Sequence, residues 1–467
     1  MSEGYAWAGH RLFTGADGVG ALLFGEDHAS LFSVEEEACP IVERWRARER
    51  VALDDAQPPD REVLEALRDA RILVPWGHRG RAPRAAHDPA AIPLKTLVLE
   101  VAQACNLRCA YCYAGGGTYG GDARLVDAET ARRAARFLVD ASGDRTAVTL
   151  VLFGGEPLLN LPAMRAAVEE AEAAAAKAGK RLHVALTTNG TRFTPEVLRF
   201  LREHRVSVSV SIDGPPDVHD RNRRYAAGGG TYADVVEGLE LFRAHAGRLP
   251  AARVTLTPDQ WSRAEEVFLH LLGLGFVEVG IAPASPVTAD LFPTAEQEDA
   301  LLAGFAALAA RFVDEAGEGR ILPFANVLDL LARLHRGEAR DVACGAGLGY
   351  VAVDAAGRFF RCHRLSGEAA FCLGDLDTGL DASRARACLA ALASPREEAC
   401  ARCWARSLCA GGCHYENHLR EGRMGLPPGG SCDFIRRWLE LGIQAYARLR
   451  RQSADAVLAF LERRADA

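Results

Sequence analysis

The stretch Cys105-Asn106-Leu107-Arg108-Cys109-Ala110-Tyr111-Cys112 decides what fold and chemistry to expect of this chain. Its three cysteines, Cys105, Cys109 and Cys112, are called the first triad below. Three thiolates this close together can hold three irons of a 4Fe-4S cubane, which normally takes four thiolates. The fourth iron is then open to a small molecule. Taken alone, these residues also allow a zinc knuckle or a chance cluster.

Bulk composition excludes several classes of protein. The chain has 467 residues, of which 49% are hydrophobic, so we expect a globular protein of several domains. We predict a cytoplasmic protein without a membrane partner, because the N-terminus is polar and the Ala-rich segment 166–178 is interrupted by Glu and Lys. The net charge of −7 gives no support for nucleic-acid binding. Thirteen cysteines in a reducing compartment predict buried thiols or metal ligands rather than disulfides.

Residues 1–80 read as a separate small module. Apolar runs at Arg11–Thr14, Val19–Phe24 and Ser30–Val34 predict a small antiparallel sheet. One helix is expected from Val34 to Arg48, and a second after Pro58-Pro59-Asp60. A sheet and helices of this size resemble a winged-helix fold.

In peptide-modifying enzymes such a module binds the leader of a precursor peptide, which adds as a strand to a sheet edge. A purely structural domain and a DNA-binding winged helix are the alternatives. Residues 1–79 contain 15 Asp and Glu against 9 Arg and no Lys, the wrong sign for phosphate contacts.

After a linker at 81–93, the pattern changes to alternating strands and helices over 94–315. Such alternation predicts an α/β fold with a parallel sheet, and six strands predict a partial (β/α)6 barrel of the TIM type. Reacting groups in such barrels lie at the C-terminal ends of strands, and the first triad directly follows the first strand. The six predicted strands are Thr96–Ala102, Ala147–Phe153, His183–Thr188, Val206–Ile212, Arg253–Leu256 and Glu278–Ala282.

The rest of the chain divides into a bridging region at 316–343, a cysteine-dense domain at 344–432 and C-terminal helices at 433–467. A helix is expected from Asp433 to about Leu449, with a second segment through Leu461.

Three strand ends carry polar or glycine-rich segments. Gly154-Gly155-Glu156-Pro157 offers close backbone approach, free carbonyls and a carboxylate to an ammonium group, although a simple strand-ending turn is the alternative. Thr187-Thr188-Asn189-Gly190 ends the third strand. In Ser209-Val210-Ser211-Ile212-Asp213-Gly214, both serines can donate to a ribose or carboxylate oxygen, and Asp213 could accept a proton or merely make a turn.

The C-terminal cysteines form a second constellation. Cys344 and Cys362 are followed by Cys400-x2-Cys403-x5-Cys409-x3-Cys413 and by Cys432. Four cysteines within fourteen positions and a distant fifth favour an iron-sulfur cluster over a zinc ribbon. Cys39 and Cys388 read as ordinary buried thiols.

With Tyr111 before its last cysteine, the first triad resembles the motif of the radical S-adenosylmethionine enzymes, and the later cysteines resemble the SPASM domain. The resemblance implies that S-adenosylmethionine caps a 4Fe-4S cluster on the first triad. It implies two auxiliary clusters, one on the quartet Cys400, Cys403, Cys409 and Cys432, and one on the second triad Cys344, Cys362 and Cys413. Asp213 is expected as a catalytic residue on the substrate side. The expected cofactor-binding residues are Tyr111, Gly154, Gly155, Glu156, Pro157, Asn189, Ser209 and Ser211.

The second triad lacks a fourth cysteine ligand. Cys372 is a possible substitute, and Glu338 or Asp341 could supply an oxygen. The remaining possibility is an open iron, which a substrate cysteine thiolate could bind.

Segments around these cysteines, including Cys362-His-Arg-Leu-Ser-Gly and Cys403-Trp-Ala-Arg-Ser-Leu-Cys, resemble the peptide thioether maturases of the quinohemoprotein amine dehydrogenase and ranthipeptide (SCIFF) types. The resemblance implies that a 5′-deoxyadenosyl radical abstracts hydrogen and that cysteine sulfur is joined to carbon in a ribosomal precursor peptide or small protein subunit. The expected electron donor is a flavodoxin or ferredoxin. Carbon-carbon cyclophane formation, another SPASM peptide oxidation, and a non-catalytic iron-sulfur regulator are the alternatives.

Overall fold

The computed structural model describes residues 4–16, 20–25, 29–78, 92–340, 343–393, 400, 403–422, 429–452 and 454–464. The linker expected at 81–93 lies almost entirely outside the described residues. No helix among these described segments is long and apolar enough to cross a membrane.

The N-terminal module contains the antiparallel sheet that the sequence predicts, with the order β2-β3-β4. A second small sheet, β5-β1-β6, was not predicted. The strands are β1 (Gly4–Trp7), β2 (His10–Ala16), β3 (Gly20–Gly25), β4 (Ser30–Val34), β5 (Val51–Ala52) and β6 (Leu73–Pro75).

The two helices of this module are α1 (Cys39–Arg46) and α2 (Asp60–Asp69). Helix α2 begins at Asp60 as predicted. The predicted start of the first helix at Val34 is wrong, because Val34 ends β4 and a 3-10 turn at Glu36–Ala38 precedes α1. Pro40 lies in the first turn of α1, where its missing N–H is tolerated, and so marks the true start.

The six predicted barrel strands are confirmed, and they pair in parallel in the order β13-β12-β11-β10-β9-β7. Their pairing leaves the sheet open, as expected of a partial barrel. The bounds are β7 (Thr96–Gln103), β9 (Ala147–Gly154), β10 (Arg181–Thr188), β11 (Ser207–Ser211), β12 (Ala251–Leu256) and β13 (Glu278–Pro283).

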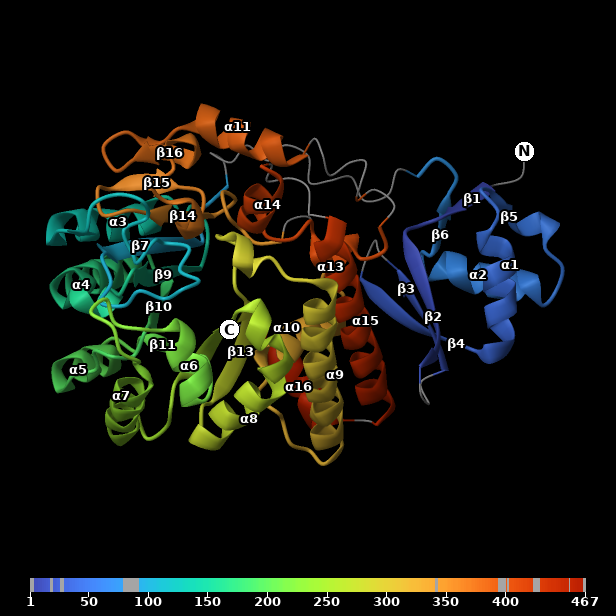
Figure 1. The fold of residues 1–467 in the computed structure, drawn as a ribbon. Coiled ribbons are helices and arrows are strands. Elements are labelled where there is room, and N and C mark those ends of the chain that lie inside the picture. Colours follow the sequence, from blue (N-terminus) through green and yellow to red (C-terminus); the bar gives the residue numbers. More distant parts are fainter. Residues whose placement is uncertain are drawn as a thin grey trace.

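Helices lie between these strands along the outer side of the curved sheet (Figure 1). Side chains alternate along a strand, so Leu97, Leu152 and Val210 reach the helix-side core while their neighbours face inward. The helices are α3 (Ala128–Asp140), α4 (Leu161–Lys177), α5 (Pro195–Glu203), α6 (Pro216–Asn222), α7 (Tyr232–Ala246), α8 (Ala264–Leu274), α9 (Ala295–Gly317) and α10 (Ala325–Arg336).

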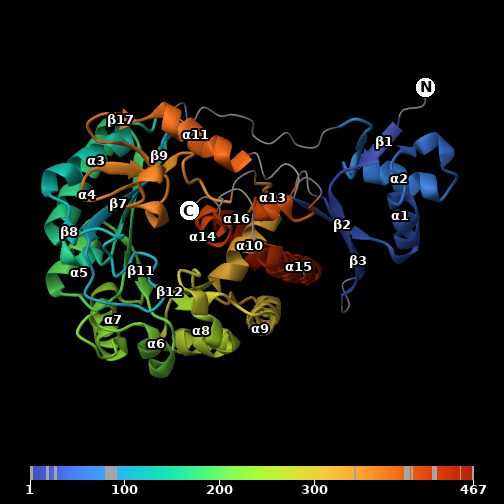
Figure 2. The same ribbon diagram turned by 45° about the horizontal axis from the view of Figure 1, so that its top comes forward.

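The cysteine-dense region extends the barrel sheet, which was not predicted. Strand β14 (Tyr350–Val353) pairs in parallel with β7, and the antiparallel strands β15 (Arg358–Phe360), β16 (Cys372–Asp375) and β17 (Gly379–Leu380) follow. Figure 1 shows β14, β15 and β16 beside β7, with α11 (Ala382–Ala393) above them, and Figure 2 shows β17 near α11. A short strand, β8 (Arg124–Leu125), also pairs with β7.

The C-terminal helices lie on the β13 side of the barrel, where they pack on helices that follow that strand. Helix α15 (Gly429–Arg451) packs on α9 and α10, and α16 (Asp455–Arg464) packs on α10 (Figure 1). Both C-terminal helices were predicted, although α15 begins four residues before Asp433. Two predicted ligands lie at the ends of short helices. Cys409 is the last residue of α13 (Arg406–Cys409), and Cys413 directly precedes α14 (His414–Glu421).

Candidate functional site

The first triad lies in the loop that leaves the carboxyl end of β7, next to the loop after β9. Backbone amides of Gly155 and Glu156 donate to the carbonyls of Ala102 and Ala104, at 2.7 and 2.9 Å. A Cβ on Gly155 would come within 2.3 Å of the Ala104 carbonyl oxygen. The glycine is therefore required because two backbones touch there, directly before Cys105.

Glu156 is fully buried, and its carboxylate is already bound by the protein. One oxygen accepts the Thr188 hydroxyl at 2.7 Å and the Leu158 amide at 3.0 Å, and the other accepts the Asn189 amide at 2.7 Å. Burial raises the pKa of Glu156, and these donors oppose that effect. The carboxylate thus ties the end of β9 to the end of β10.

Asn189 links the third strand to the cysteine loop. Its side-chain amide donates to Asn106 at 2.9 Å and lies 3.9 Å from the Cys105 sulfur. Thr191 binds both asparagines, accepting from Asn106 and donating to Asn189. The structure therefore brings Asn189 to the first triad.

Ser209 and Ser211 lie on the inner face of the sheet. The residue between them, Val210, is buried in the helix-side core, so the alternation of β11 turns both serines the other way. Neither hydroxyl has a hydrogen-bond partner among the described residues. Arg253 pairs with Ser211 in register and is exposed, so this face is open to a ligand.

Asp213 is not exposed on this face, because its side chain is fully buried. The Tyr111 hydroxyl donates to one carboxylate oxygen at 2.5 Å, and the Thr255 amide donates to the other at 2.9 Å. The guanidinium of Arg223 in turn donates to the Tyr111 hydroxyl at 2.7 Å. Burial raises the pKa of Asp213, and the charge of Arg223 opposes it. This placement suits a residue that positions Tyr111 rather than one that meets a substrate.

Residues 222–226, called the bracket below, hydrogen-bond to the backbone of the cysteine loop. The sequence did not predict this role. The Ala110 amide donates to the Asn222 carbonyl, the Arg108 amide to the Arg224 carbonyl, and the Ala226 amide to the Asn106 carbonyl, at 2.8–3.0 Å. The segment directly follows α6.

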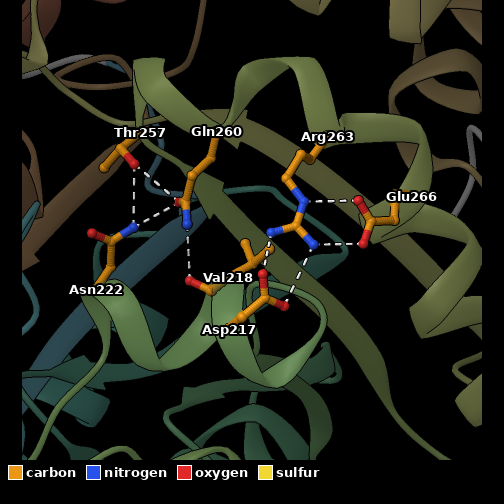
Figure 3. Close-up of polar contacts among 7 residues, drawn as sticks. All are labelled: Asp217, Val218, Asn222, Thr257, Gln260, Arg263 and Glu266. Carbon is orange, nitrogen blue, oxygen red and sulfur yellow. Dashed lines mark hydrogen bonds and ion pairs between the residues drawn. The ribbon is translucent and has the colours of Figure 1, made fainter.

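Figure 3 shows how α6 is held in place. The buried Asn222 amide donates to Gln260 at 2.7 Å and to Thr257 at 3.2 Å, and Gln260 donates to the Val218 carbonyl at 3.1 Å. At the surface, Arg263 joins Asp217 on α6 to Glu266 on α8. The sequence feature that could have indicated this support of the cysteine loop is the run of polar residues after Asp213-Gly214.

Within each of the three cysteine groups, thiols lie near enough to raise one another's pKa. Burial raises the pKa of Cys105 to about 11, and the nearby Cys109 and Cys112 thiols contribute to the rise. In the second triad, burial raises the pKa of Cys362 to about 12, with Cys344 and Cys413 among the neighbours that raise it.

In the quartet, burial raises the pKa of Cys409 to about 11, and Cys400, Cys432 and Cys403 raise it further. No three Cys, His, Asp or Glu side chains among the described residues converge tightly enough for a single metal ion. The raised pKa of Cys105, Cys362 and Cys409 means that these thiols ionise readily only when a cationic centre takes them as ligands, which fits iron-sulfur clusters.

The proposed substitutes for a fourth ligand of the second triad differ in their surroundings. Cys372 pairs with Phe360 in the β15–β16 ladder, two residues before Cys362, and both cysteines border the same apolar cluster. The Cys372 thiol donates to the Gly374 carbonyl at 3.5 Å, and Cys372 remains a candidate ligand. Glu338 pairs with Arg336 at 2.8 Å. Asp341 lies outside the described residues.

Arg364 connects the surroundings of the two triads. Its guanidinium lies 5.1 Å from the ring of Tyr113, which directly follows Cys112. It donates to Glu416 at 2.9 Å and to Ser285, in the loop after β13, at 2.8 Å. The second triad thus borders the carboxyl end of the barrel.

Residues 99–267 match the model of the Radical SAM superfamily. The chain contains a radical SAM domain. The domain holds the first triad, the Gly154–Pro157 loop and the bracket at 222–226, and it confirms the cofactor class that the triad predicted, a 4Fe-4S cluster with S-adenosylmethionine.

Relatives of this radical SAM protein include the serine-type anaerobic sulfatase-maturating enzyme of Bacteroides thetaiotaomicron, which is 32% identical over 162 residues. That match covers 34% of this chain and 38% of the enzyme, so the chain matches well under half of the length of this relative.

Two solved structures resemble the radical SAM protein over most of its length. Native anSMEcpe with bound AdoMet superposes with a TM-score of 0.65 at 19% identity, covering 78% of this chain and 99% of that one. Streptococcus suis SuiB bound to the precursor peptide SuiA gives a TM-score of 0.51 at 12% identity, covering 90% and 98%. At these identities the likeness establishes the fold, a mixed α/β radical SAM fold with a C-terminal cysteine-rich region.

Proposed function

We propose that this radical SAM protein modifies a ribosomally made peptide or small protein subunit and joins a cysteine sulfur of that substrate to carbon. The observation that carries the proposal is the first triad at the carboxyl edge of the sheet, with the second triad bordering the same edge through Arg364 and Ser285. One of the structures that share this fold, Streptococcus suis SuiB, is bound to a precursor peptide.

When bound, the cluster and S-adenosylmethionine would supply a 5′-deoxyadenosyl radical that abstracts hydrogen. Cys105, Cys109 and Cys112 would hold that cluster, and the Gly154–Pro157 backbone would accept the methionine ammonium. Ser209 and Ser211 have free hydroxyls on the open inner face for ribose or carboxylate oxygens. Tyr111, oriented by Asp213, packs with Ala284 and Leu291 and so helps to exclude water beside Cys109.

The second triad supports the thioether assignment. Glu338 pairs with Arg336, and we assign Cys344, Cys362 and Cys413 to that cluster as its protein ligands, with Cys372 as the alternative fourth ligand. An iron with three protein ligands can take a substrate thiolate, which would present the sulfur to the carbon radical. The quartet would hold a complete cluster with a structural or electron-transfer role.

We also propose that the N-terminal module binds the precursor. Strand β4 pairs with β3 on one side, and among the described strands no other pairs with its second side. An extended peptide can add to such an edge. A flavodoxin or ferredoxin would supply the electron.

Coexpression with the precursor encoded beside this chain tests the function. We expect each cross-link to remove two hydrogens from the peptide mass and one cysteine from the alkylatable pool. The Cys105→Ala variant should leave the peptide unmodified. A two-hydrogen loss with all cysteines still alkylatable would instead indicate a carbon-carbon link.

Anaerobically reconstituted protein tests the enzyme class separately. With dithionite and S-adenosylmethionine it should form 5′-deoxyadenosine, and Cys105→Ala should not. Equal product from both proteins, or none from either, would contradict the proposal.

A further inference from the structure

Arg223 is a buried cation whose hydrogen-bonding capacity is only partly used. Its side chain is 6% exposed, and one terminal nitrogen donates to the Tyr111 hydroxyl. Its Nε–H has no partner among the described residues, although the atom is buried. A buried donor without an acceptor costs free energy, so an acceptor is expected when the site is complete.

The group beside Arg223 that offers such an acceptor is the sulfur of Cys109. The Arg108 amide donates to the Arg224 carbonyl, and Leu107 pairs antiparallel with Tyr225, so Cys109 lies directly opposite Arg223 in this short pairing. Backbone contacts hold the two residues together, because the Ala110 amide donates to the Asn222 carbonyl at 3.0 Å. Cys109 directly precedes Ala110 and Arg223 directly follows Asn222, so the two residues lie next to this hydrogen bond.

The opposite charge nearby is Asp213, which reaches Arg223 through Tyr111. The Tyr111 hydroxyl accepts from Arg223 and donates to Asp213, and the Thr255 amide fixes the second carboxylate oxygen. The cation, the phenol and the carboxylate form one buried chain that ends at the first triad.

We propose that Arg223 donates its Nε–H to the Cys109 thiolate of the bound cluster and thereby sets the reduction potential of that cluster. The proposal deepens the proposed function, because it concerns the cluster on the first triad. Hydrogen bonds to cluster sulfurs and nearby charge are determinants of such potentials. A cation and a donor stabilise the more negative reduced form, so Arg223 raises the potential, and the Asp213 carboxylate offsets part of that rise.

Arg223 and Asp213 are positioning residues in this account, and the opposite signs of their effects separate it from a purely structural role. Loss of packing would not shift the potential in opposite directions for two neighbours that share one hydrogen-bonded chain.

The test is an anaerobic redox titration of the cluster-loaded full chain, followed by electron paramagnetic resonance. The signal of the first cluster is identified as the one that Cys105→Ala lacks. We expect Arg223→Gln to lower its midpoint potential, Arg223→Lys to lower it less because charge is kept but the Nε–H is lost, and Asp213→Asn to raise it. Arg263→Gln, which removes an exposed cation on the next element, should leave the potential unchanged.

If Arg223→Gln binds no iron, Arg223→Lys and Asp213→Asn decide the question. Unchanged potentials in both, or shifts of the same sign, would overturn the proposal. The readout is independent of turnover. A wild-type chain that carries the first cluster but makes no 5′-deoxyadenosine would fail the proposed function alone, and the shifts would still be measured.

Discussion

Gly155 stands where any side chain would strike a carbonyl oxygen of the cysteine loop. The 2.3 Å that would separate a Cβ at this position from the Ala104 oxygen is far inside van der Waals contact, and a backbone atom cannot move aside as a flexible side chain can. We expect Gly155→Ala to push the two loops apart and to weaken S-adenosylmethionine binding at least tenfold, about 1.4 kcal/mol. Equilibrium binding to the cluster-loaded protein measures this.

Gly273 provides the matched control. It lies within α8, and a Cβ there would meet nothing within 4 Å. Gly273→Ala should bind the cofactor as wild type does and gain about 0.5–1 kcal/mol of stability from helix propensity. Equal binding by the Gly155 and Gly273 variants would contradict the close-approach argument.

Glu100, on the inner side of β7, makes stability depend on pH. It is fully buried, one of its oxygens lacks a hydrogen-bond partner among the described residues, and desolvation raises its pKa to about 8. The folded chain therefore keeps a proton that the unfolded chain loses, so the contribution of Glu100 to stability is fully present below about pH 4.5 and is lost as pH rises through about 8.

Glu100→Gln should remove this dependence and keep the hydrogen bond to Gln103. Relative to wild type, the free energy of unfolding of the variant should rise by a few kcal/mol, to order of magnitude, between about pH 5.5 and about pH 8.5. Anaerobic urea unfolding of both proteins at the two pH values checks this. Parallel pH profiles would rule out a buried, protonated carboxyl.

At the residue scale, the sequence indicated which side chains belong to the candidate site. It did not indicate which groups each of these side chains contacts. The spacing of the cysteines predicted that they bind clusters, and the family resemblance supplied their division into the quartet and the second triad. The contacts of Glu156 and Asp213 did not follow, since a carboxylate that binds a ligand and one that binds a neighbouring amide look the same in a sequence. Arg223 was missed because its partners, Tyr111 and Asp213, come from two other segments.

At the scale of elements, α6 is held by one buried network and one exposed ion pair, which should differ in strength. Asn222→Ala removes the donor that Gln260 and Thr257 share, although these two residues stay hydrogen-bonded to each other, and we expect the change to cost about 1–3 kcal/mol. Arg263→Ala removes contacts to Asp217 and Glu266 that are partly in solvent, and should cost about 0–1 kcal/mol and less at high salt.

Urea unfolding at low and high salt compares the two variants. A larger loss of unfolding free energy for Arg263→Ala, or a salt-dependent loss for Asn222→Ala, would contradict this expectation. The buried network would then not be the stronger support of the bracket at 222–226.

Element prediction succeeded where periodicity was strong. Each barrel strand is an apolar run bounded by turn residues, and all six were placed within a few residues. The three-residue strand β6 and the two-residue strand β5 carry too little pattern to be seen. The pairing of β14 with β7 joins segments about 250 residues apart, and local sequence does not encode such a partner.

At the scale of the whole molecule, one hydrophobic core extends across the expected domains, although the N-terminal module also has a core of its own. Phe13 and Phe24 of the N-terminal module make edge contacts with Trp404, at 5.5 and 6.0 Å between ring centres. Ile443 and Leu449 on α15 belong to the same core as the barrel helices. The domain bounds predicted from the sequence therefore mark changes in the pattern of strands and helices, and hydrophobic packing continues across these bounds.

This sharing predicts that the barrel does not fold without the segments that follow it. A chain ending at Gly337 would lose β14 and so expose the edge of β7 along Thr96–Leu99, and it would uncover α9 and α10, where α15 packs. Unpaired edges and apolar faces promote association. We expect the shortened chain to aggregate on size-exclusion chromatography, whereas a full-length variant with Cys344, Cys362 and Cys413 all changed to Ala stays soluble and cooperative. That variant keeps β14 and α15 and loses only the ligands, so it separates loss of packing from loss of a cluster. A soluble shortened chain with a cooperative unfolding transition would show that the barrel is an independent domain, as the sequence pattern alone suggests.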